Sequence, residues 1–115
     1  MKSVRVIFSK EAEEVYQYLN RSSDEEEKRI LKMVNKKIEL IKENFHYGEP
    51  ISKKKIPNKY IKKYNITNLF WVELPHFWRM LYSLREGENK IEIIAFVLDI
   101  INHKTYDRIF DYKKK

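Results

Sequence analysis

The pattern of apolar and polar positions in the first part of the chain predicts one strand followed by two amphipathic helices. Residues 4–8 alternate and include β-branched side chains, which predicts a short strand. Ser9 is placed to cap the helix that follows it. The apolar residues of that helix recur at helical spacing on one stripe, at Ala12, Val15, Tyr16 and Leu19.

A second, longer helix follows a break at residues 20–22. Ser23 and Glu26 have the spacing of a capping box, and apolar residues then recur at intervals of three or four up to Phe45. Gly48 and Pro50 end the pattern. Each helix has one apolar face and one face of mixed charge, so we expect a helical hairpin that packs against another layer.

The second half of the chain changes to the pattern of strands. Residues 58–64 are predicted as a short helix, residues 75–77 as a turn, and residues 103–110 as a final short helix. The predicted strands are residues 69–74, 78–84 and 91–100. This order predicts an α+β fold with residues 1–115 as a single domain, in which an antiparallel sheet carries the N-terminal helical hairpin on one face and a short C-terminal helix.

Composition excludes several classes of protein. The chain contains no cysteine, which excludes a disulfide framework, a thiolate zinc site and a cysteine nucleophile. It lacks a glycine-rich phosphate loop, and its three histidines are too scattered for a metal motif, so we expect neither a metal nor another cofactor. No apolar run resembles a signal peptide or is long enough to span a membrane, which predicts a cytoplasmic protein.

The net charge of +7 is concentrated in one segment. Residues 53–85 contain eight Lys and Arg but a single acidic residue, Glu73, whereas the charges on either side of this segment balance. A concentrated positive charge favours a polyanionic partner, because Lys and Arg displace counterions from phosphate backbones. A solvated surface loop in a lysine-rich protein would give the same pattern.

Lysines and tyrosines alternate in this segment in a way that suits single-stranded RNA, which is bound by phosphate contacts and by aromatic stacking. The residues concerned are Lys53, Lys54, Lys55, Lys59, Lys62 and Lys63, interleaved with Tyr60 and Tyr64. A solvated loop explains them equally well. The two tryptophans, Trp71 and Trp78, are interpreted as packing residues.

Three further residues are candidates for chemistry. Arg79 lies inside a predicted strand, so it either faces an open surface, where it can bind a phosphate with two hydrogen bonds, or pairs with a carboxylate such as Glu73. His103 and Tyr106 are three residues apart in the last predicted helix and would share a face. Histidine can transfer a proton near neutral pH and tyrosine can stack or donate a hydrogen bond, although both also occur as ordinary helix residues.

The order and spacing of these segments resemble the RelE/ParE toxin superfamily. Residues 68–74, 78–84 and 103–110 are similar to the C-terminal half of these toxins, in which a strand with an Arg-x-x-Tyr pattern precedes a hydrophobic strand and a terminal segment running from His or Arg to Tyr. Residues 9–12 look like the start of the same toxins. The chain is longer than compact RelE toxins, chiefly in the helical hairpin and in residues 49–68.

The resemblance implies a toxin that a cognate antitoxin neutralises and that enters the ribosome to cleave mRNA without a metal, through the 2′-hydroxyl of the RNA. Arg79 would match the strand arginine, Tyr106 the C-terminal tyrosine, and His103 a basic or histidine position of the family. A lysine of residues 53–55 would match the lysines ahead of the sheet, with Lys54 as the catalytic candidate. The remaining lysines are expected to bind RNA.

Two other functions fit the same fold. A ParE-like toxin that inhibits DNA gyrase would bind a protein and would not require Arg79, His103 and Tyr106 to converge. An inactive family member or an unrelated RNA-binding domain would also carry the positive segment. The endoribonuclease hypothesis, in contrast, predicts that Arg79, Tyr106, His103 and some of residues 53–55 converge on one basic, concave face.

Overall fold

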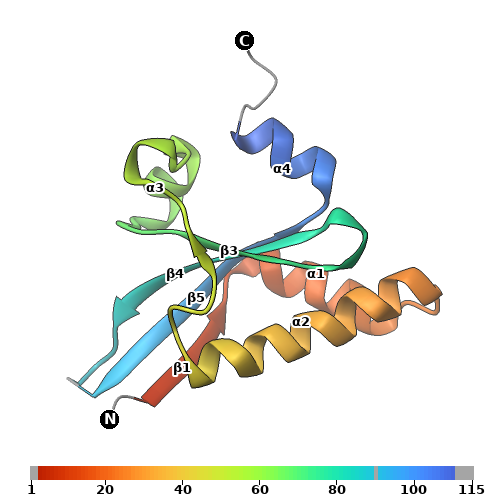
Figure 1. The fold of residues 1–115 in the computed structure, drawn as a ribbon, viewed down its shortest axis with the longest axis horizontal. Helices are drawn as coiled ribbons and strands as arrows, with labels where there is room; N and C mark the ends of the chain where they lie inside the picture. The colour runs from red at the N-terminus through yellow and green to blue at the C-terminus, as the bar shows by residue number, and fades with distance from the viewer. Residues whose placement is uncertain (1–2, 90, 111–115) are drawn as a thin grey trace.

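The computed structural model describes residues 3–89 and 91–110, which form an α+β fold around one sheet. Within these residues the sheet has five strands in the order β1-β5-β4-β3-β2 (Figure 1). The strands are β1 (Ser3–Phe8), β2 (Glu49–Pro50), β3 (Phe70–Glu73), β4 (Arg79–Glu86) and β5 (Glu92–Ile101). The helices are α1 (Lys10–Arg21), α2 (Glu25–Glu43), α3 (Asn58–Tyr64) and α4 (His103–Phe110), with short 3-10 turns η1 (Lys53–Lys55) and η2 (Pro75–Phe77). The predicted α+β class and its helical hairpin are confirmed.

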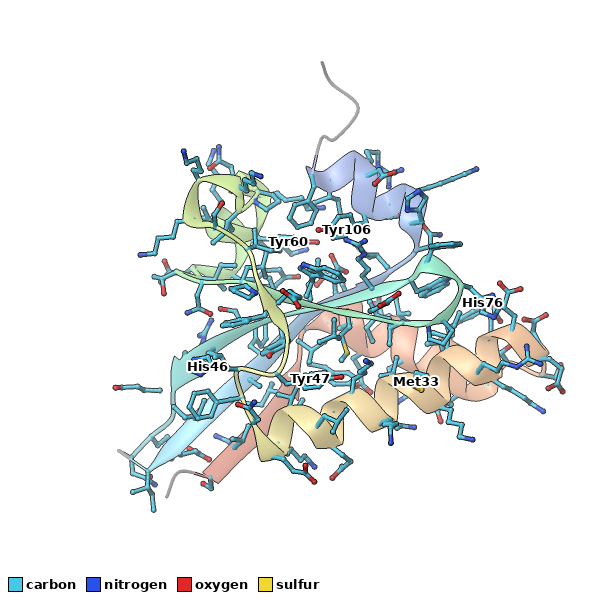
Figure 2. All side chains as sticks on the ribbon, viewed as in Figure 1. Met33, His46, Tyr47, Tyr60, His76 and Tyr106 are labelled. Atoms are coloured by element: carbon cyan, nitrogen blue, oxygen red, sulfur yellow. The ribbon has the colours of Figure 1, made fainter. Side chains whose placement is uncertain are left out.

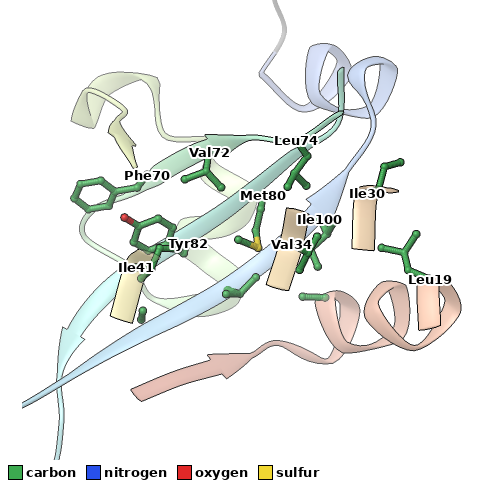
Figure 3. Packing of buried hydrophobic residues seen from close by; sticks show 13 residues of the cluster. Leu19, Ile30, Val34, Ile41, Phe70, Val72, Leu74, Met80, Tyr82 and Ile100 are labelled. Carbon is green, nitrogen blue, oxygen red and sulfur yellow. The ribbon is translucent and has the colours of Figure 1, made fainter. Parts of the chain in front are cut away.

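The helical hairpin of α1 and α2 packs its apolar stripes on one face of the sheet (Figure 3). Ser9 caps α1 by accepting a hydrogen bond from the Ala12 amide at 3.0 Å, and its hydroxyl donates to the Leu98 carbonyl of β5 at 2.6 Å. The buried side chains that the hairpin contributes are Ala12, Leu19, Ile30, Val34 and Ile41. They meet the sheet residues Phe70, Val72, Met80, Tyr82, Val97 and Ile100. The periodic apolar positions of the sequence are therefore the contact surface of the hairpin.

The cap of α2 lies one residue later than its sequence pattern suggests. Asp24 accepts a hydrogen bond from the Glu27 amide at 3.0 Å, so the predicted capping box of Ser23 and Glu26 is wrong by one residue. Both serine and aspartate are good caps, and the carboxylate of Asp24 adds a favourable charge at the positive end of the helix.

The sheet is mixed rather than entirely antiparallel. β1 lies at its edge and runs parallel to β5, with Ser3 opposite Glu92 and Phe8 opposite Val97. The other strands pair antiparallel. β1 finds its partner at the far end of the sequence, so no turn between the two strands could reveal their relative direction. β2 has only two residues, one of them proline, and gives no alternating pattern.

A β-bulge in β5 changes which residues face which side of the sheet. Leu81 of β4 lies opposite Asp99, but the next residue, Tyr82, lies opposite Val97, so Leu98 is an extra residue in β5. Leu98 packs in the apolar cluster beneath α3 and α4, and the Asp99 carboxylate accepts a hydrogen bond from a side chain of α3. The bulge therefore directs two consecutive side chains to the same face.

Helices α3 and α4 stand on the opposite side of the sheet from α1 and α2 (Figure 1). A second apolar cluster lies beneath them and includes Ile56, Tyr60, Leu69, Leu81, Leu98, Ile101 and Tyr106. This face carries the residues that the sequence singled out for chemistry. No helix among the described residues has an apolar segment long enough to cross a lipid bilayer.

Candidate functional site

Arg79 is the first residue of β4 and lies on the face of the sheet that carries α3 and α4. The strand pairing sets it opposite Glu73 of β3 and Ile101 of β5. Its guanidinium carbon is 4.1 Å from the centre of the Trp71 ring and 4.3 Å from the centre of the Tyr106 ring. The two rings hold the cation between them by cation–π contact and stacking. We call these three residues, Trp71, Arg79 and Tyr106, the Arg79 clamp.

The clamp keeps a permanent cation available for an anion. Glu73 lies opposite Arg79 but forms no ion pair with it, and within residues 3–89 and 91–110 no hydrogen bond or ion pair involves the guanidinium of Arg79. Stacking occupies the two faces of a guanidinium and leaves the N–H groups on its edge for a bidentate acceptor such as a phosphate. The alternative of a structural Arg79–Glu73 ion pair is therefore not realised.

Tyr106 reaches the clamp from α4 and is almost fully buried, at 3% exposure. Its ring stacks on Phe110 with the ring centres 4.3 Å apart. Figure 2 shows its side chain in the space between α3 and α4, close to that of Tyr60. A side chain this buried contacts Arg79 and exposes little surface to a substrate. The geometry therefore assigns Tyr106 the role of positioning the Arg79 guanidinium.

His103 lies at the exposed end of the same helix. Its Nε2 atom is 3.2 Å from Oδ2 of Asp107, and its side chain is 60% exposed. The centre of its ring is 6.0 Å from that of Phe77 in turn η2. His103 and Tyr106 are thus neighbours on α4, but one faces solvent and the other faces Arg79. Asp107 lies four residues after His103 and orients the imidazole. This spacing places two residues on the same face of a helix, so the pair could have been predicted from the sequence.

Phe77 is an unusual residue beside the candidate site. It is a large apolar side chain with 76% exposure, and both it and His76 have positive φ values, of 64° and 59°. Positive φ is unfavourable for residues other than glycine, so the turn must be held in place. One restraint is the contact of His76 Nδ1 with Glu26 of α2 at 3.1 Å. The sequence marked this segment only as a turn and gave no sign of the exposed ring.

The lysines at 53–55 form turn η1 and are exposed. Among residues 3–89 and 91–110, no hydrogen bond joins the side chains of Lys53, Lys54 or Lys55 to Arg79. The predicted catalytic role of Lys54 and the RNA-binding roles of Lys53 and Lys55 remain predictions.

The lysines of α3 have separate environments. All three are exposed, but Lys59 and Lys63 line a pocket together with Arg108 of α4, whereas Lys62 does not. Lys63 also pairs with Glu11 of α1, and this hydrogen bond is the main reason that the pKa of Glu11 falls from 4.5 to about 2. Lys63 is therefore partly neutralised, and Lys59 and Lys62 are better placed to meet an anion.

The other histidines have local partners. The His46 ring lies between Phe45 and Phe70, at centre-to-centre distances of 4.5 Å and 5.8 Å. Figure 2 shows His46 and His76 at opposite sides of the molecule. Residues 3–89 and 91–110 contain no group of three or more His, Asp or Glu side chains placed to hold a metal ion.

Comparison with known proteins identifies the fold. No protein-family model matches the sequence, and no curated protein matches it significantly. Among solved structures, the YoeB dimer from Staphylococcus aureus is similar, with a TM-score of 0.56 and 21% sequence identity. The match covers 88% of this chain and 98% of the YoeB chain. The present chain therefore shares its fold with YoeB.

Proposed function

We propose that the protein is the toxin of a toxin–antitoxin pair and that it cleaves mRNA on the ribosome at the Arg79 clamp. The observation that carries the proposal is the clamp itself, in which the half-buried Arg79 is held between Trp71 and Tyr106 without a carboxylate partner. An arginine left without a counter-ion on a protein scaffold is suited to bind a phosphate. The fold shared with YoeB supports the same conclusion.

The proposed reaction uses the RNA's own 2′-hydroxyl as the nucleophile. The 2′-oxygen attacks the adjacent phosphorus, the bond from phosphorus to the 5′-oxygen breaks, and a 2′,3′-cyclic phosphate and a 5′-hydroxyl result. The reaction needs a base for the 2′-proton, a cation for the extra negative charge at phosphorus, and an acid for the leaving 5′-oxygen. No metal is required in this scheme, because side chains supply the cations and one of the two proton transfers, and water supplies the other.

The residues of the site divide these roles. Arg79 stabilises the charge at phosphorus, and Tyr106 keeps the guanidinium in position. His103 transfers a proton, with Asp107 orienting its ring. Lys54 supplies a second cation from turn η1 when the RNA brings the two segments together.

The proposed partners follow from the charge. The +7 excess is carried by one segment, so the ribosome and its mRNA are the polyanionic partners, and a cognate antitoxin would cover the same basic face. The remaining RNA contacts come from Lys53, Lys55, Lys59, Lys62 and Lys63. Such a toxin acts in the cytoplasm, where the ribosomes are.

A translation reaction run beside a DNA supercoiling reaction with purified gyrase tests this function. We compare wild type with Arg79→Ala and with Arg85→Ala, which removes another arginine from the same strand and the same face. Wild type and Arg85→Ala should stop translation, Arg79→Ala should not, and supercoiling should be unaffected. Inhibition of supercoiling with translation intact would instead establish a gyrase-binding protein.

A further inference from the structure

A second polar site lies beside the Arg79 clamp, in a pocket of about 220 Å³ bounded by α1, α3, β5 and α4. Its walls are partly apolar, with Ile101 and Ile109 on one side and Tyr64 on another. Its volume is below the range typical of sites for drug-sized molecules, so it has room for one flat ring system rather than a larger ligand.

The floor of the pocket carries a carboxylate that the β-bulge places there. Asp99 lines the pocket, and its Oδ2 atom accepts a hydrogen bond of 2.7 Å from the Tyr60 hydroxyl. Tyr60 is 1% exposed, so this hydrogen bond fixes the carboxylate from the protein side. Each carboxylate oxygen can accept two hydrogen bonds, so most of the accepting capacity of Asp99 is still available to a ligand. Bulges commonly redirect a side chain next to a functional site.

The surroundings of Asp99 differ from those of a structural ion pair. Burial raises its pKa above the ordinary 3.8, and no lysine or arginine of the described residues forms a direct ion pair with it. The hydrogen bond from Tyr60 opposes this rise. A partly buried carboxylate with one neutral partner is a strong acceptor for N–H donors.

Cations lie around the same pocket. Lys59 and Arg108 line it from α3 and α4, and neither forms an ion pair with a carboxylate of residues 3–89 or 91–110. The third cation, Lys63, is paired with Glu11. The pocket therefore presents acceptors at its floor and unpaired positive charge from two helices.

We infer that this pocket binds a single nucleobase that offers N–H donors to Asp99, with guanine preferred, and that Lys59 and Arg108 hold the attached phosphate. Guanine places its N1–H and its amino group side by side, which matches the two oxygens of a carboxylate. Cytosine and adenine offer one amino group beside a ring acceptor, so they fit less well. Uracil places its single N–H between two carbonyl oxygens, which a carboxylate repels.

The pocket is adjacent to the proposed phosphate site. Arg79 lies opposite Ile101 and Leu81 lies opposite Asp99, so Arg79 and Asp99 are diagonal neighbours on one face of the sheet. Diagonal neighbours are typically separated by roughly 7–8 Å, about the spacing between a phosphate and a nearby base. The assignment of the natural ligand as a base of the bound mRNA rests on the proposed function, whereas binding of a free nucleotide does not.

NMR titration of the whole protein with free mononucleotides tests the inference. Guanosine monophosphate should shift the backbone amides of Tyr60, Asp99 and Thr105, and inosine monophosphate, which lacks the amino group, should bind several-fold more weakly. Uridine monophosphate should bind weakest.

Asp99→Asn, which keeps an acceptor for Tyr60, should weaken guanosine monophosphate binding about tenfold or more. Lys59→Ala should weaken it, whereas Lys36→Ala, which removes an exposed lysine of α2 on the other face of the sheet, should not.

Equal affinity for all the nucleotides, the absence of shifts at the pocket amides, or unchanged binding by a folded Asp99→Asn would overturn the inference. Folding of each variant is checked by its own NMR spectrum. If the protein selects guanosine monophosphate but does not cut mRNA, the assignment of the pocket stands and the proposed function is refuted. If mRNA is cleaved with no preference for guanine and the Asp99→Asn variant cleaves it equally well, the proposed function stands and the assignment of the pocket is refuted.

Discussion

At the scale of single residues, the site depends on how Arg79 is held. Its guanidinium contacts one ring from the neighbouring strand and one from the C-terminal helix, at 4.1 Å and 4.3 Å. A side chain held on both faces loses little conformational freedom when it binds an anion, so more of the binding energy is available for the reaction. The cation is therefore preorganised rather than merely present.

The clamp predicts different effects for two changes at Tyr106. Tyr106→Phe keeps the ring that contacts Arg79, so cleavage should stay within about threefold of wild type if this contact is the role of the residue. Tyr106→Leu removes the ring face and should lower the single-turnover cleavage rate by about tenfold, because such contacts are worth roughly 0.5–2 kcal/mol. Abolished cleavage in a folded Tyr106→Phe would show that the hydroxyl takes part in the chemistry.

A substitution at Phe77 is expected to raise the stability of the protein and to lower its activity. Phe77→Gly should relieve the strain of a positive φ value, 64°, and raise the free energy of unfolding by about 1 kcal/mol. The same change removes the exposed ring beside His103 and should slow cleavage. Urea unfolding and single-turnover cleavage measure the two effects. Phe77→Ala is the control, since it loses the ring but keeps the strain. A destabilised Phe77→Gly would contradict this account of the turn.

At the scale of elements, the sequence located most of the structure because the signals were local. Apolar periodicity predicted α1 and α2, the strand pattern on either side of the turn at residues 75–77 predicted β3 and β4, and a nearly continuous apolar run predicted β5. The cap at Asp24, the parallel pairing of β1 and the extra residue Leu98 could not be predicted in the same way. The first depends on a choice between adjacent capping residues, and the other two depend on partners distant in the sequence.

Helix α3 is attached to α1 through polar contacts that are sensitive to pH. Glu11 accepts hydrogen bonds from Lys63 and from Tyr64 of α3, and these hold its pKa at about 2 instead of 4.5. A carboxyl with a lowered pKa stabilises the folded state above pH 4.5, and this contribution is lost as the pH falls toward 2. Both side chains of the ion pair are substantially exposed, so salt should weaken it.

This contact predicts the behaviour of Glu11→Gln. The variant should have a lower free energy of unfolding than wild type at pH 7, and the difference should shrink as the pH falls below 4.5. Urea unfolding between pH 7 and pH 3 measures the difference. Glu14→Gln, an exposed change on the same helix, should show no comparable difference. A gap that persists unchanged at low pH would show that the ion pair is not its cause.

At the scale of the whole molecule, the site is assembled from segments that are far apart in the chain. Trp71, Arg79 and Tyr106 come from β3, β4 and α4, and the sheet register together with the docking of α4 brings them together. The sequence identified Arg79 and Tyr106 by type and order. It predicted only a packing role for Trp71, because a contact across strands leaves no local pattern. It did not single out Asp99, because a bulge leaves none either.

The two faces of the sheet differ in what covers them. The helical hairpin buries the larger apolar cluster on one face, whereas α3, with Lys59, Lys62 and Lys63, and α4 stand on the other (Figure 1). This division leaves the face of α3 and α4 available for a partner without loss of the main core.

Cleavage of a defined mRNA on programmed ribosomes tests the central claim most directly, with one message of ordinary RNA and one carrying a single 2′-deoxynucleotide at the cut. The proposed mechanism predicts that wild type cuts the first message, leaves a 2′,3′-cyclic phosphate, and does not cut the second, and that Arg79→Ala cuts neither. Cleavage of the 2′-deoxy message at the same position, or undiminished cleavage by Arg79→Ala, would contradict it.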